Sequence, residues 1–215
     1  LIDAEGTGKL INLTRSGFDD GHPRFSTDGS TIFWATDREG TRNLNQDSAT
    51  VDYFGLFLTQ KAWDRFQLSK EDFALVKERE DKEKKELEKA KDKDKDKAKE
   101  KEKDAKPSVE PLRIDWQGLE ERKARWTTHT APMADAVLAK DGEKFFYLAK
   151  FEKGFDLWST EFRTKETKLV AKLDARQAAL ERSEDGKAIF ILADGKLSKI
   201  DPENGKRENL VAATE

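Results

Sequence analysis

One pattern of polar and hydrophobic positions recurs three times along the chain. Each copy has a polar lead-in, an Asp-Gly pair and then a nearly unbroken run of β-branched, aromatic and aliphatic residues. The copies are FSTDGSTIFWAT at 25–36, VLAKDGEKFFYLA at 137–149 and RSEDGKAIFILA at 182–193. A tight turn that leads into a buried strand is typical of this pattern, so each copy is predicted to form a β-hairpin. We expect positive φ at Gly29, Gly142 and Gly186, because each glycine lies in the turn.

A second hairpin is predicted after the Asp-Gly hairpin of each unit. The stretches 157–173 and 200–211 each place a polar turn between two apolar segments, and 2–14 resembles the second of them. The Asp-Gly pairs begin at Asp28, Asp141 and Asp185, so the steps are 113 and 44 residues. A four-stranded unit of about 44 residues is typical of a β-propeller blade. The first unit therefore carries an insertion.

The sequence thus predicts an all-β fold, a partial β-propeller of about three four-stranded antiparallel blades. Residues 1–14 are expected to be closing strands of a preceding blade. The first full blade is 15–130 with an insertion at about 60–106, the second is 131–174 and the third is 175–215. Helical solenoids are the alternative for a repeat of this length, but Ile-Phe-Trp, Phe-Phe-Tyr and Ile-Phe-Ile favour strands.

The insertion is predicted to begin with two helices. Residues 53–59, YFGLFLT, supply a third strand. Thr59 then caps a short helix that carries Trp63 and Phe66, and Ser69 begins a second helix in which Phe73 is on the apolar face.

In the second half of the insertion, only interactions between charged side chains are available to stabilise a helix. Residues 77–106 contain 26 charged residues in 30 positions, and acid-to-base pairs at i,i+4 favour helix to about Ala90. In KDKDKDK at 91–97 like charges are spaced i,i+4, so we expect disorder through Lys106. The return at 112–116, followed by 124–128, is expected to supply the fourth strand. A solvated tether is favoured over a coiled coil, because apolar a and d positions are missing.

Composition excludes several classes of site and partner. The net charge is −3, which gives no electrostatic reason to expect nucleic acid or an anionic membrane as partner. The chain has no cysteine, so disulfides and zinc thiolate sites are excluded. No apolar run approaches the ~18 residues of a membrane helix, and no charged-then-apolar leader opens the chain. Because the chain begins at Leu1 inside a repeat-like segment, we expect it to be an excised fragment.

The candidate phosphate-binding and metal-binding residues are better explained by structural roles. EGTGKL at 5–10 lacks the first glycine and the final Ser or Thr of a phosphate-binding loop. The histidines, His22 and His129, lack a metal-binding spacing; both are placed just before the first strand of a blade, where a channel-lining role is conceivable but a turn role is favoured. We therefore expect no catalytic, cofactor-binding or metal-binding residue in this chain, and no cofactor.

The remaining polar and aromatic candidates occupy repeat or turn positions. The serines lack the G-x-S-x-G elbow, and the paired carboxylates lie next to turns, where aspartate accepts local hydrogen bonds. Four tryptophans fall in predicted strands and one on the helix face, so packing is favoured over a ligand platform. These residues are Ser26, Ser159, Ser183, Ser198, Asp19, Asp20, Glu184, Asp185, Trp34, Trp63, Trp116, Trp126 and Trp158.

The chain resembles the propeller region of tricorn-like serine peptidases, bacterial members in particular. Their P-x-F-S-x-D-G-x-x-I-x-F hairpin is matched from Pro23 to Phe33, although TolB-like and prolyl-oligopeptidase-type propellers share it and Thr27 replaces a common proline. A more specific match is PLRIDWQGLEERKARWT at 111–127, which is similar to an I-D-x-x-G-x-x-x-R segment after an insertion. YFGLFLTQKAWDRF at 53–66 adds to the resemblance.

The resemblance implies a non-catalytic propeller that gates or channels peptides toward a C-terminal serine peptidase core absent from this sequence. Peptide substrates of the parent protein are the implied partners, with a possible homo-oligomer through the full-length chain. Cytoplasm is the compartment implied by the family, and periplasm is the alternative. The alternative function is a TolB-like or scaffold propeller that binds a protein partner and has no enzyme activity.

Overall fold

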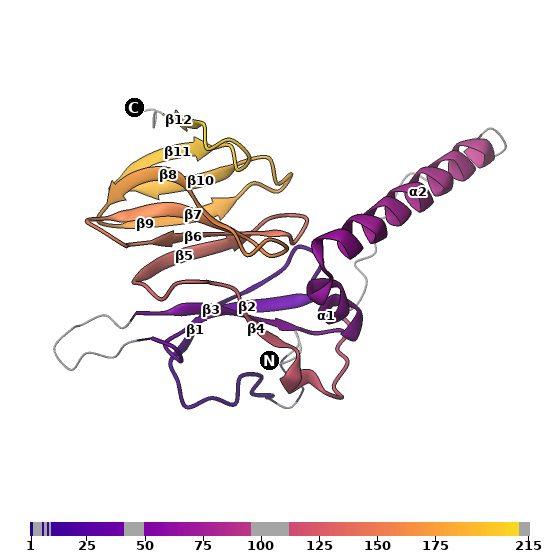
Figure 1. Ribbon diagram of the computed structural model, residues 1–215, viewed down its shortest axis with the longest axis horizontal. Helices are drawn as coiled ribbons and strands as arrows, with labels where there is room; N and C mark the ends of the chain where they lie inside the picture. Colours follow the sequence, from indigo (N-terminus) through magenta and orange to yellow (C-terminus); the bar gives the residue numbers. More distant parts are fainter. Residues whose placement is uncertain (2–5, 7, 9, 41–49, 96–111, 211–215) are drawn as a thin grey trace.

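Three four-stranded antiparallel sheets stack face to face (Figure 1). The computed structural model describes residues 1, 6, 8, 10–40, 50–95 and 112–210. In each sheet the strand order follows the chain order, as expected of propeller blades. The predicted all-β, partial propeller architecture is therefore confirmed.

Each sheet corresponds to one predicted unit. The first contains β1 (Asp20–Phe25), β2 (Thr31–Thr36), β3 (Asp52–Phe57) and β4 (Lys123–Arg125). The second contains β5 (Met133–Leu138), β6 (Lys144–Ala149), β7 (Phe155–Glu161) and β8 (Thr167–Ala175). The third contains β9 (Ala178–Arg182), β10 (Ile189–Ala193), β11 (Lys196–Ile200) and β12 (Arg207–Asn209).

The three Asp-Gly turns have the same conformation. Gly29, Gly142 and Gly186 have φ of 69°, 77° and 79°, which confirms the expected positive values. Each glycine N–H donates to the carbonyl three residues earlier, at 2.9–3.0 Å. A left-handed residue at the end of a tight turn is typical of short hairpin loops, and glycine adopts it without a Cβ clash.

Two apolar clusters hold the stack together. Side chains of β6 alternate between them, because successive residues of a strand point to opposite faces. Phe145 and Tyr147 pack toward the first sheet, whereas Phe146 and Leu148 pack toward the third. All four are 0–2% exposed, so the continuous apolar run of this strand is explained by burial on both faces.

The outer face of the first sheet is covered by the return from the insertion. Leu119 and Ile114 pack on a cluster that includes Trp34 and Leu56, together with Leu13 from the N-terminal segment. The return is only partly the predicted strand: 112–116 forms no strand, and β4 covers three residues. A 3-10 turn, η1 (Leu119–Glu121), lies between them.

The I-D-x-x-G-x-x-x-R segment has a structural explanation. The Asp115 carboxylate accepts the backbone N–H of Gln60 at 2.8 Å, and Gly118 has φ of 68°. Arg122 is 2% exposed and donates to the carbonyls of Phe57 at 3.1 Å and Gln117 at 2.8 Å. These contacts fix the return against the end of β3.

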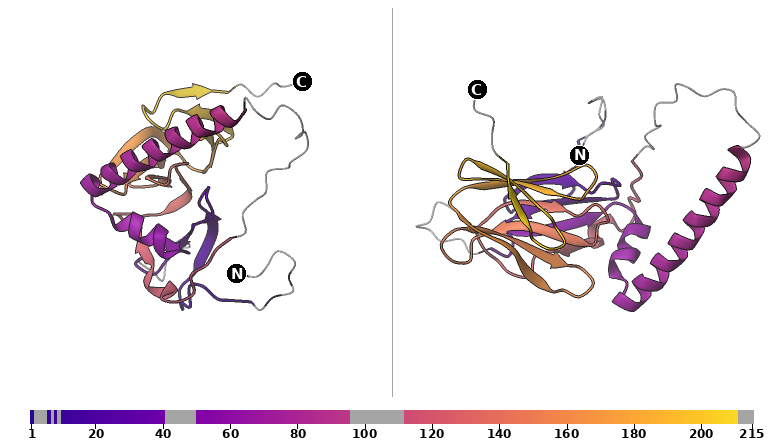
Figure 2. Two further views of the ribbon diagram at one scale, coloured as in Figure 1. Left: turned by 90° about the vertical axis from the view of Figure 1, so that its right-hand side faces the viewer. Right: turned by 90° about the horizontal axis from the view of Figure 1, so that it is seen from above.

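The start of the insertion is as predicted. α1 (Gln60–Gln67) has Thr59 as its N-cap, whose hydroxyl accepts the N–H of Ala62. Ser69 precedes α2 (Lys70–Lys95) and accepts the N–H of Asp72 at 3.1 Å. Phe73 is 8% exposed, and α2 then projects away from the sheets (Figure 2).

The predicted end of this helix was wrong. α2 continues through Ala90 to Lys95, into the alternating Lys-Asp run. Elongating an existing helix costs no new nucleation, so each added residue needs less stabilisation than the first turn does. The part of the expected disorder beyond Lys95, 96–106, lies outside the described residues.

Two ion pairs are observed on α2. Glu78 and Lys82 pair at 2.8 Å with the expected i,i+4 spacing, and Glu80 pairs with Arg65 of α1 at 2.6 Å. This second contact connects the two helices near the base of α2. None of the described helices is apolar enough over a sufficient length to span a bilayer.

The closing strands expected at 1–14 stay a prediction. Leu1 and Ile11 exchange two backbone hydrogen bonds of 2.7 and 2.9 Å, as in an antiparallel pair, but the described residues of this segment form no strand. Several residues between them lie outside the described part. The blade boundaries at 15–130, 131–174 and 175–215 stay a prediction, and β8 ends at Ala175, one residue beyond the boundary expected at 174.

Candidate functional site

Three edge strands, one from each sheet, converge on one side of the stack. β1, β5 and β9 are each the first strand of their sheet, and β5 contacts β9. Arg24 of β1 links all three, because its guanidinium lies 3.2 Å from Asp135 of β5 and 3.3 Å from Glu181 of β9. Since propeller blades surround a central channel, these residues, here called the Arg24 cluster, mark the candidate channel wall.

Asp135 is the anchor of the Arg24 cluster. Its side chain is 17% exposed, whereas that of Glu181 is 72% exposed. Besides Arg24, it accepts the backbone N–H of Leu180 at 2.9 Å, which lies on the edge strand of the third sheet. The partly buried pair of Arg24 and Asp135 thus joins blades, while the contact to Glu181 is a weak surface pair.

Tyr53 lies behind this wall and stays protonated at neutral pH. Burial raises the pKa of its phenol, and the Asp135 carboxylate raises it further, against an opposing effect of Arg24. A phenol held neutral in this way cannot act as a base or nucleophile near pH 7. Its contribution is to the core between the first two sheets.

His22 is inside β1, not before it as expected. It is exposed and has φ of 53°, in the region where the register between β1 and β2 shifts. A bulge in an edge strand redirects a side chain, so the imidazole is available on the converging edge. The channel-lining interpretation stays a prediction.

His129 lies outside the strands. Its ring is 5.7 Å from that of Phe151 in an edge-to-face arrangement. Among the residues that the structure describes, no group of three or more His, Cys, Asp or Glu side chains could hold a metal ion.

The four candidate serines have structural contacts. Ser26 donates to Asp28 at 2.6 Å and accepts the N–H of Thr31 at 3.0 Å, and Ser183 repeats this arrangement with Asp185 at 2.7 Å and Ala188 at 2.9 Å. Ser159 and Ser198 are buried in β7 and β11. Each turn serine therefore binds its own hairpin.

The turn carboxylates are held in the ionised form. Burial by itself would raise the pKa of Asp28, but hydrogen bonds from Ser26 and Ser30 outweigh it and lower the pKa. The N–H of Lys187 and the hydroxyl of Ser183 lower the pKa of Asp185 in the same way. A carboxylate with a lowered pKa is a poor general acid at neutral pH.

The adjacent residues Asp19 and Asp20 have different partners. The Asp19 N–H donates to Asp37, whereas Asp20 accepts the indole N–H of Trp34 at 3.1 Å. Burial alone would raise the pKa of Asp20, but hydrogen bonds from Ser16 and other side chains lower it.

The tryptophans are packing residues with one exception. Trp34 and Trp126 are 6% and 3% exposed, and Trp63 and Trp158 pack against the cluster between the first two sheets. Trp116, which was expected in a strand, is 53% exposed on the return. Four of the five interpretations as packing residues are therefore confirmed by burial or cluster contacts.

Half of the glycine-containing stretch at 5–10 lies outside the described residues, namely 5, 7 and 9. The hairpin between β11 and β12, its counterpart, is an ordinary turn in which Gly205 has φ of 71° and its N–H donates to the carbonyl of Asp201 at 2.9 Å.

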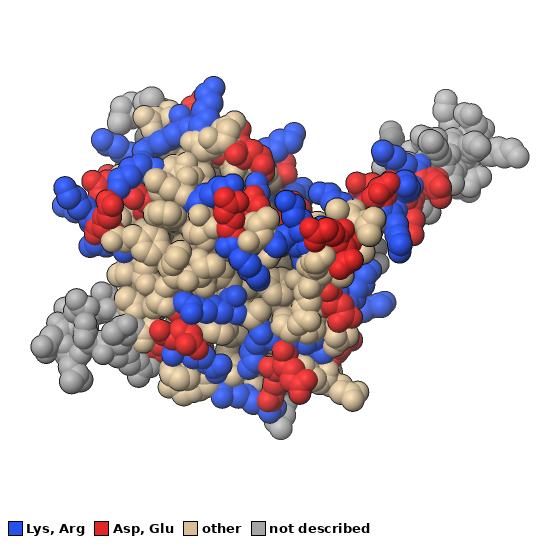
Figure 3. All heavy atoms as spheres, in the orientation of Figure 1, with Lys and Arg blue, Asp and Glu red and all other residues tan. Residues whose placement is uncertain are grey.

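Sequence reasoning missed the Arg24 cluster. Its members are separated by up to 157 residues, so only the stacking of three blades brings them together. One signal was present: Arg24 and Glu181 each stand four residues before the aspartate of an Asp-Gly turn, so equivalent blade positions carry opposite charges. On the face in Figure 3, acidic and basic side chains are likewise interspersed.

Two solved structures resemble this fold over nearly the whole chain. The crystal structure of the tricorn protease matches with a TM-score of 0.57 and 12% identity over 98% of this chain. TolB from Acinetobacter baumannii matches with a TM-score of 0.56 and 10% identity over 99%. At such identities the likeness shows the fold alone, a β-propeller.

The chain spans only part of those proteins, 19% of the tricorn protease chain and 37% of the TolB chain. No protein-family model and no curated protein sequence matches it. Fold, core and turn chemistry therefore identify this chain as part of a β-propeller.

Proposed function

We propose that this chain is a non-catalytic propeller segment of a tricorn-like serine peptidase. Its function is to gate or channel peptides toward a C-terminal protease domain that lies elsewhere in the parent protein. Peptide substrates are its partners, and the parent protein is a cytoplasmic hydrolase in this proposal, with the periplasm as the alternative compartment.

The observation that carries the proposal is the Arg24 cluster. A channel that selects peptides needs charged groups on its wall that are fixed in place but remain partly solvated. The side chain of Arg24 is 33% exposed and its guanidinium is held by Asp135, while the side chain of Glu181 is 72% exposed. The similarity of 53–66 and 111–127 to tricorn-like chains supports the peptidase context.

Charge reversal at Arg24 tests this function in the full-length protein. Arg24→Glu is expected to lower kcat/KM for peptides of about ten residues by roughly threefold to tenfold, because the wall then repels its neighbours and acidic peptides. A short chromogenic substrate that reaches the active site without the channel should retain its kcat/KM.

The matched control is Arg79→Glu, a charge reversal on the exposed side of α2. It is expected to leave kcat/KM unchanged for both the long peptide and the short chromogenic substrate. Equal losses for long and short substrates in Arg24→Glu would argue for a folding defect, and no loss at all would contradict channelling.

A TolB-like or scaffold propeller that binds a protein partner is the second candidate. It is supported by the equal structural likeness to TolB, with a TM-score of 0.56. The rest of the reading frame distinguishes the two candidate functions. A PDZ-like segment and a serine peptidase core in it would support the tricorn-like peptidase. Their absence, together with no peptide hydrolysis by the purified protein, would leave the second.

A further inference from the structure

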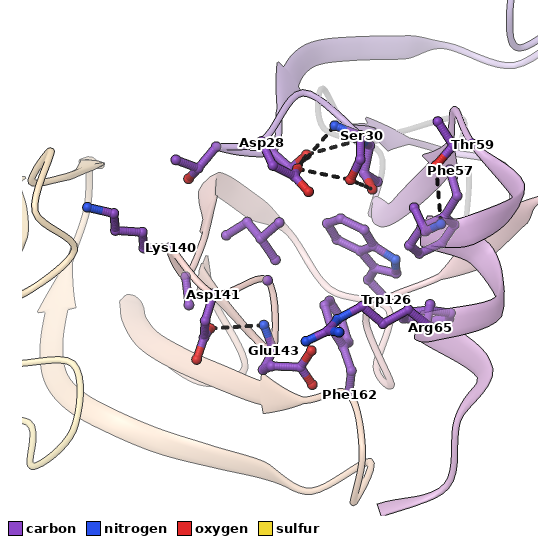
Figure 4. A pocket seen from close by; sticks show the side chains of 18 of the residues that line it. Asp28, Ser30, Phe57, Thr59, Arg65, Trp126, Lys140, Asp141, Glu143 and Phe162 are labelled. Carbon is purple, nitrogen blue, oxygen red and sulfur yellow. Dashed lines mark hydrogen bonds between the residues drawn. The ribbon is translucent and has the colours of Figure 1, made fainter. Parts of the chain in front are cut away.

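A crevice opens between the first two sheets and α1. Its volume is about 290 Å³ (Figure 4). One wall is the Asp-Gly turn of the first sheet around Asp28, the second is the equivalent turn around Asp141, and α1 closes the third side. This volume is close to the lower limit of ~300 Å³ for ligand pockets, enough for one large side chain.

The floor of the crevice is aromatic. Phe57, Trp126 and Phe162 are 3–5% exposed and line it together with the half-buried Phe66 of α1. The ring of Phe66 lies 4.5 Å from Phe57 and 5.3 Å from Phe162, and that of Trp126 lies 4.9 Å from Phe162. These rings support one another, so the floor is formed before any ligand arrives.

Most charged groups at the rim already have partners. Glu143 binds Arg163 at 2.7 and 3.2 Å, and Arg65 binds Glu80 at 2.6 Å. Asp28 accepts bonds from Ser26 and Ser30 within its turn, and Asp141 accepts the N–H of Glu143 at 3.0 Å. Two exposed lysines, Lys61 of α1 and Lys140 of the second turn, also line the rim. No ion pair observed among the described residues involves either of them.

The insertion distinguishes this crevice from its counterpart between the second and third sheets. That hollow measures about 280 Å³ and is lined by apolar residues that include Phe146 and Ile189 and by charged residues that include Lys140, with no residue of a described helix. α1 is therefore the element that adds Phe66, as an aromatic side, and Lys61, as a second lysine beside Lys140, to an inter-blade gap.

We propose that the crevice binds an acidic peptide segment through one aromatic side chain. The aromatic ring fills the hollow against Phe66 and Trp126, and a flanking carboxylate of the peptide pairs with Lys61. None of the residues of the Arg24 cluster lines the crevice, and the proposal does not depend on the peptidase context. The insertion would thus provide a peptide-docking site on the turn side of the propeller.

Three capped tripeptides test this assignment by calorimetry with the purified chain. Acetyl-Asp-Trp-Asp-amide is expected to bind about tenfold or more tightly than acetyl-Asp-Ala-Asp-amide, because burial of a large apolar side chain supplies the difference. Acetyl-Lys-Trp-Lys-amide should bind a few-fold more weakly than the acidic peptide, as expected for an exposed ion pair. Binding should shift the indole N–H resonance of Trp126 and leave that of Trp34 unchanged.

Two variants locate the site. Ala62→Phe places a ring in the hollow from α1 and should abolish binding of the tryptophan peptide. Lys61→Glu is at an exposed position that folding does not require, and it should reverse the preference between acidic and basic peptides. Lys199→Glu, on the exposed surface of β11, is the matched control and should change nothing.

Absence of binding by the tryptophan peptide would overturn the proposal. So would equal affinity for the tryptophan and alanine peptides, or an unchanged preference in Lys61→Glu. If Ala62→Phe fails to fold, Lys61→Glu and the Trp126 resonance still decide the outcome.

Discussion

Single residues set the spacing of the first blade. At Gly55 in β3, a Cβ would lie 2.2 Å from the indole of Trp126. The missing side chain lets the ring lie against the backbone, where Trp126 packs on Phe33 and Phe145 at centroid distances of 5.3 and 5.1 Å. One glycine in a central strand thus permits the aromatic cluster between two blades.

Gly55→Ala should therefore destabilise the chain by about 2 kcal/mol or more, because the new methyl group forces the buried indole to move. Gly17→Ala is the control, since a Cβ there meets nothing within 4 Å and its φ is not positive. Gly17→Ala should change the free energy of unfolding by no more than about 0.5 kcal/mol. Urea unfolding measures the free energy of unfolding of both variants. An equal loss in Gly55→Ala and Gly17→Ala would contradict the packing argument.

Asp156 at the start of β7 predicts a pH dependence. Burial alone would raise its pKa, but the backbone N–H groups of Asp174 and Leu173, with Lys172, lower it. A group whose folded-state pKa is lowered stabilises the fold above its ordinary pKa of 3.8, and this contribution is lost as the pH falls through the folded value. Asp156→Asn should thus cost about 1 kcal/mol at pH 7 and progressively less in acid.

The control is Glu152→Gln, which removes another partner of Lys172 from a 75% exposed position. Its effect should be near zero at all pH values. Denaturant unfolding between pH 7 and pH 2 compares the two variants. If the loss of unfolding free energy in Asp156→Asn stayed the same in acid, the stabilising role of the ionised Asp156 carboxylate would be refuted.

At the scale of elements, the insertion is attached to two blades by a small clamp. The ring of Phe73 lies between the guanidinium groups of Arg65 and Arg163, at 4.7 and 4.3 Å. Arg163, from the turn between β7 and β8, also donates to the carbonyls of Phe66 and Leu68 at 2.8 and 3.1 Å. The base of α2 is thereby fixed to the second blade although it belongs to the first.

Phe73→Ala should lower stability by roughly 3 kcal/mol, since it removes a buried ring and two cation–π contacts. Amide hydrogen exchange should show faster exchange in α1 and the first turns of α2 than in the sheets. Leu75→Ala, at a 55% exposed position of the same helix, is the control and should have little effect. Unchanged exchange at α1 in the Phe73 variant would contradict the clamp.

Elements that follow from local chemistry were predicted well. The Asp-Gly hairpins, the Thr59 cap and the start of α2 at Ser69 depend on residues a few positions apart, and all three are observed. The end of α2 was not predicted, because repulsion at i,i+4 was considered without the low cost of elongating an existing helix. The clamp on Phe73 could not be predicted, because Arg163 is 90 residues further along the chain.

At the scale of the whole molecule, the outer face of the third sheet is open. Leu148 of β6 and Leu192 of β10 occupy the same place, seven residues after the aspartate of their turns. Leu148 is fully buried against the third sheet, whereas Leu192 is 50% and its cross-strand neighbour Leu197 41% exposed. An apolar sheet face of this kind promotes association.

The chain is therefore expected to self-associate as its concentration rises, and Leu192→Lys should weaken this association. Leu169→Lys, at a 45% exposed position of β8, is the matched control. Gel filtration with light scattering measures the mass of each variant. A compact monomer at every concentration for the unsubstituted chain would contradict the expectation.

The sequence by itself determined the repeated hairpins, the four-stranded unit, the position of the insertion and the absence of cysteine chemistry. These features depend on turn geometry and on the alternation of side chains along a strand, which act over a few residues. Only the tertiary structure decided the Arg24 cluster, the aromatic crevice beside α1 and the clamp on Phe73. Each of these joins residues from different blades, and their distances are set by how the sheets stack.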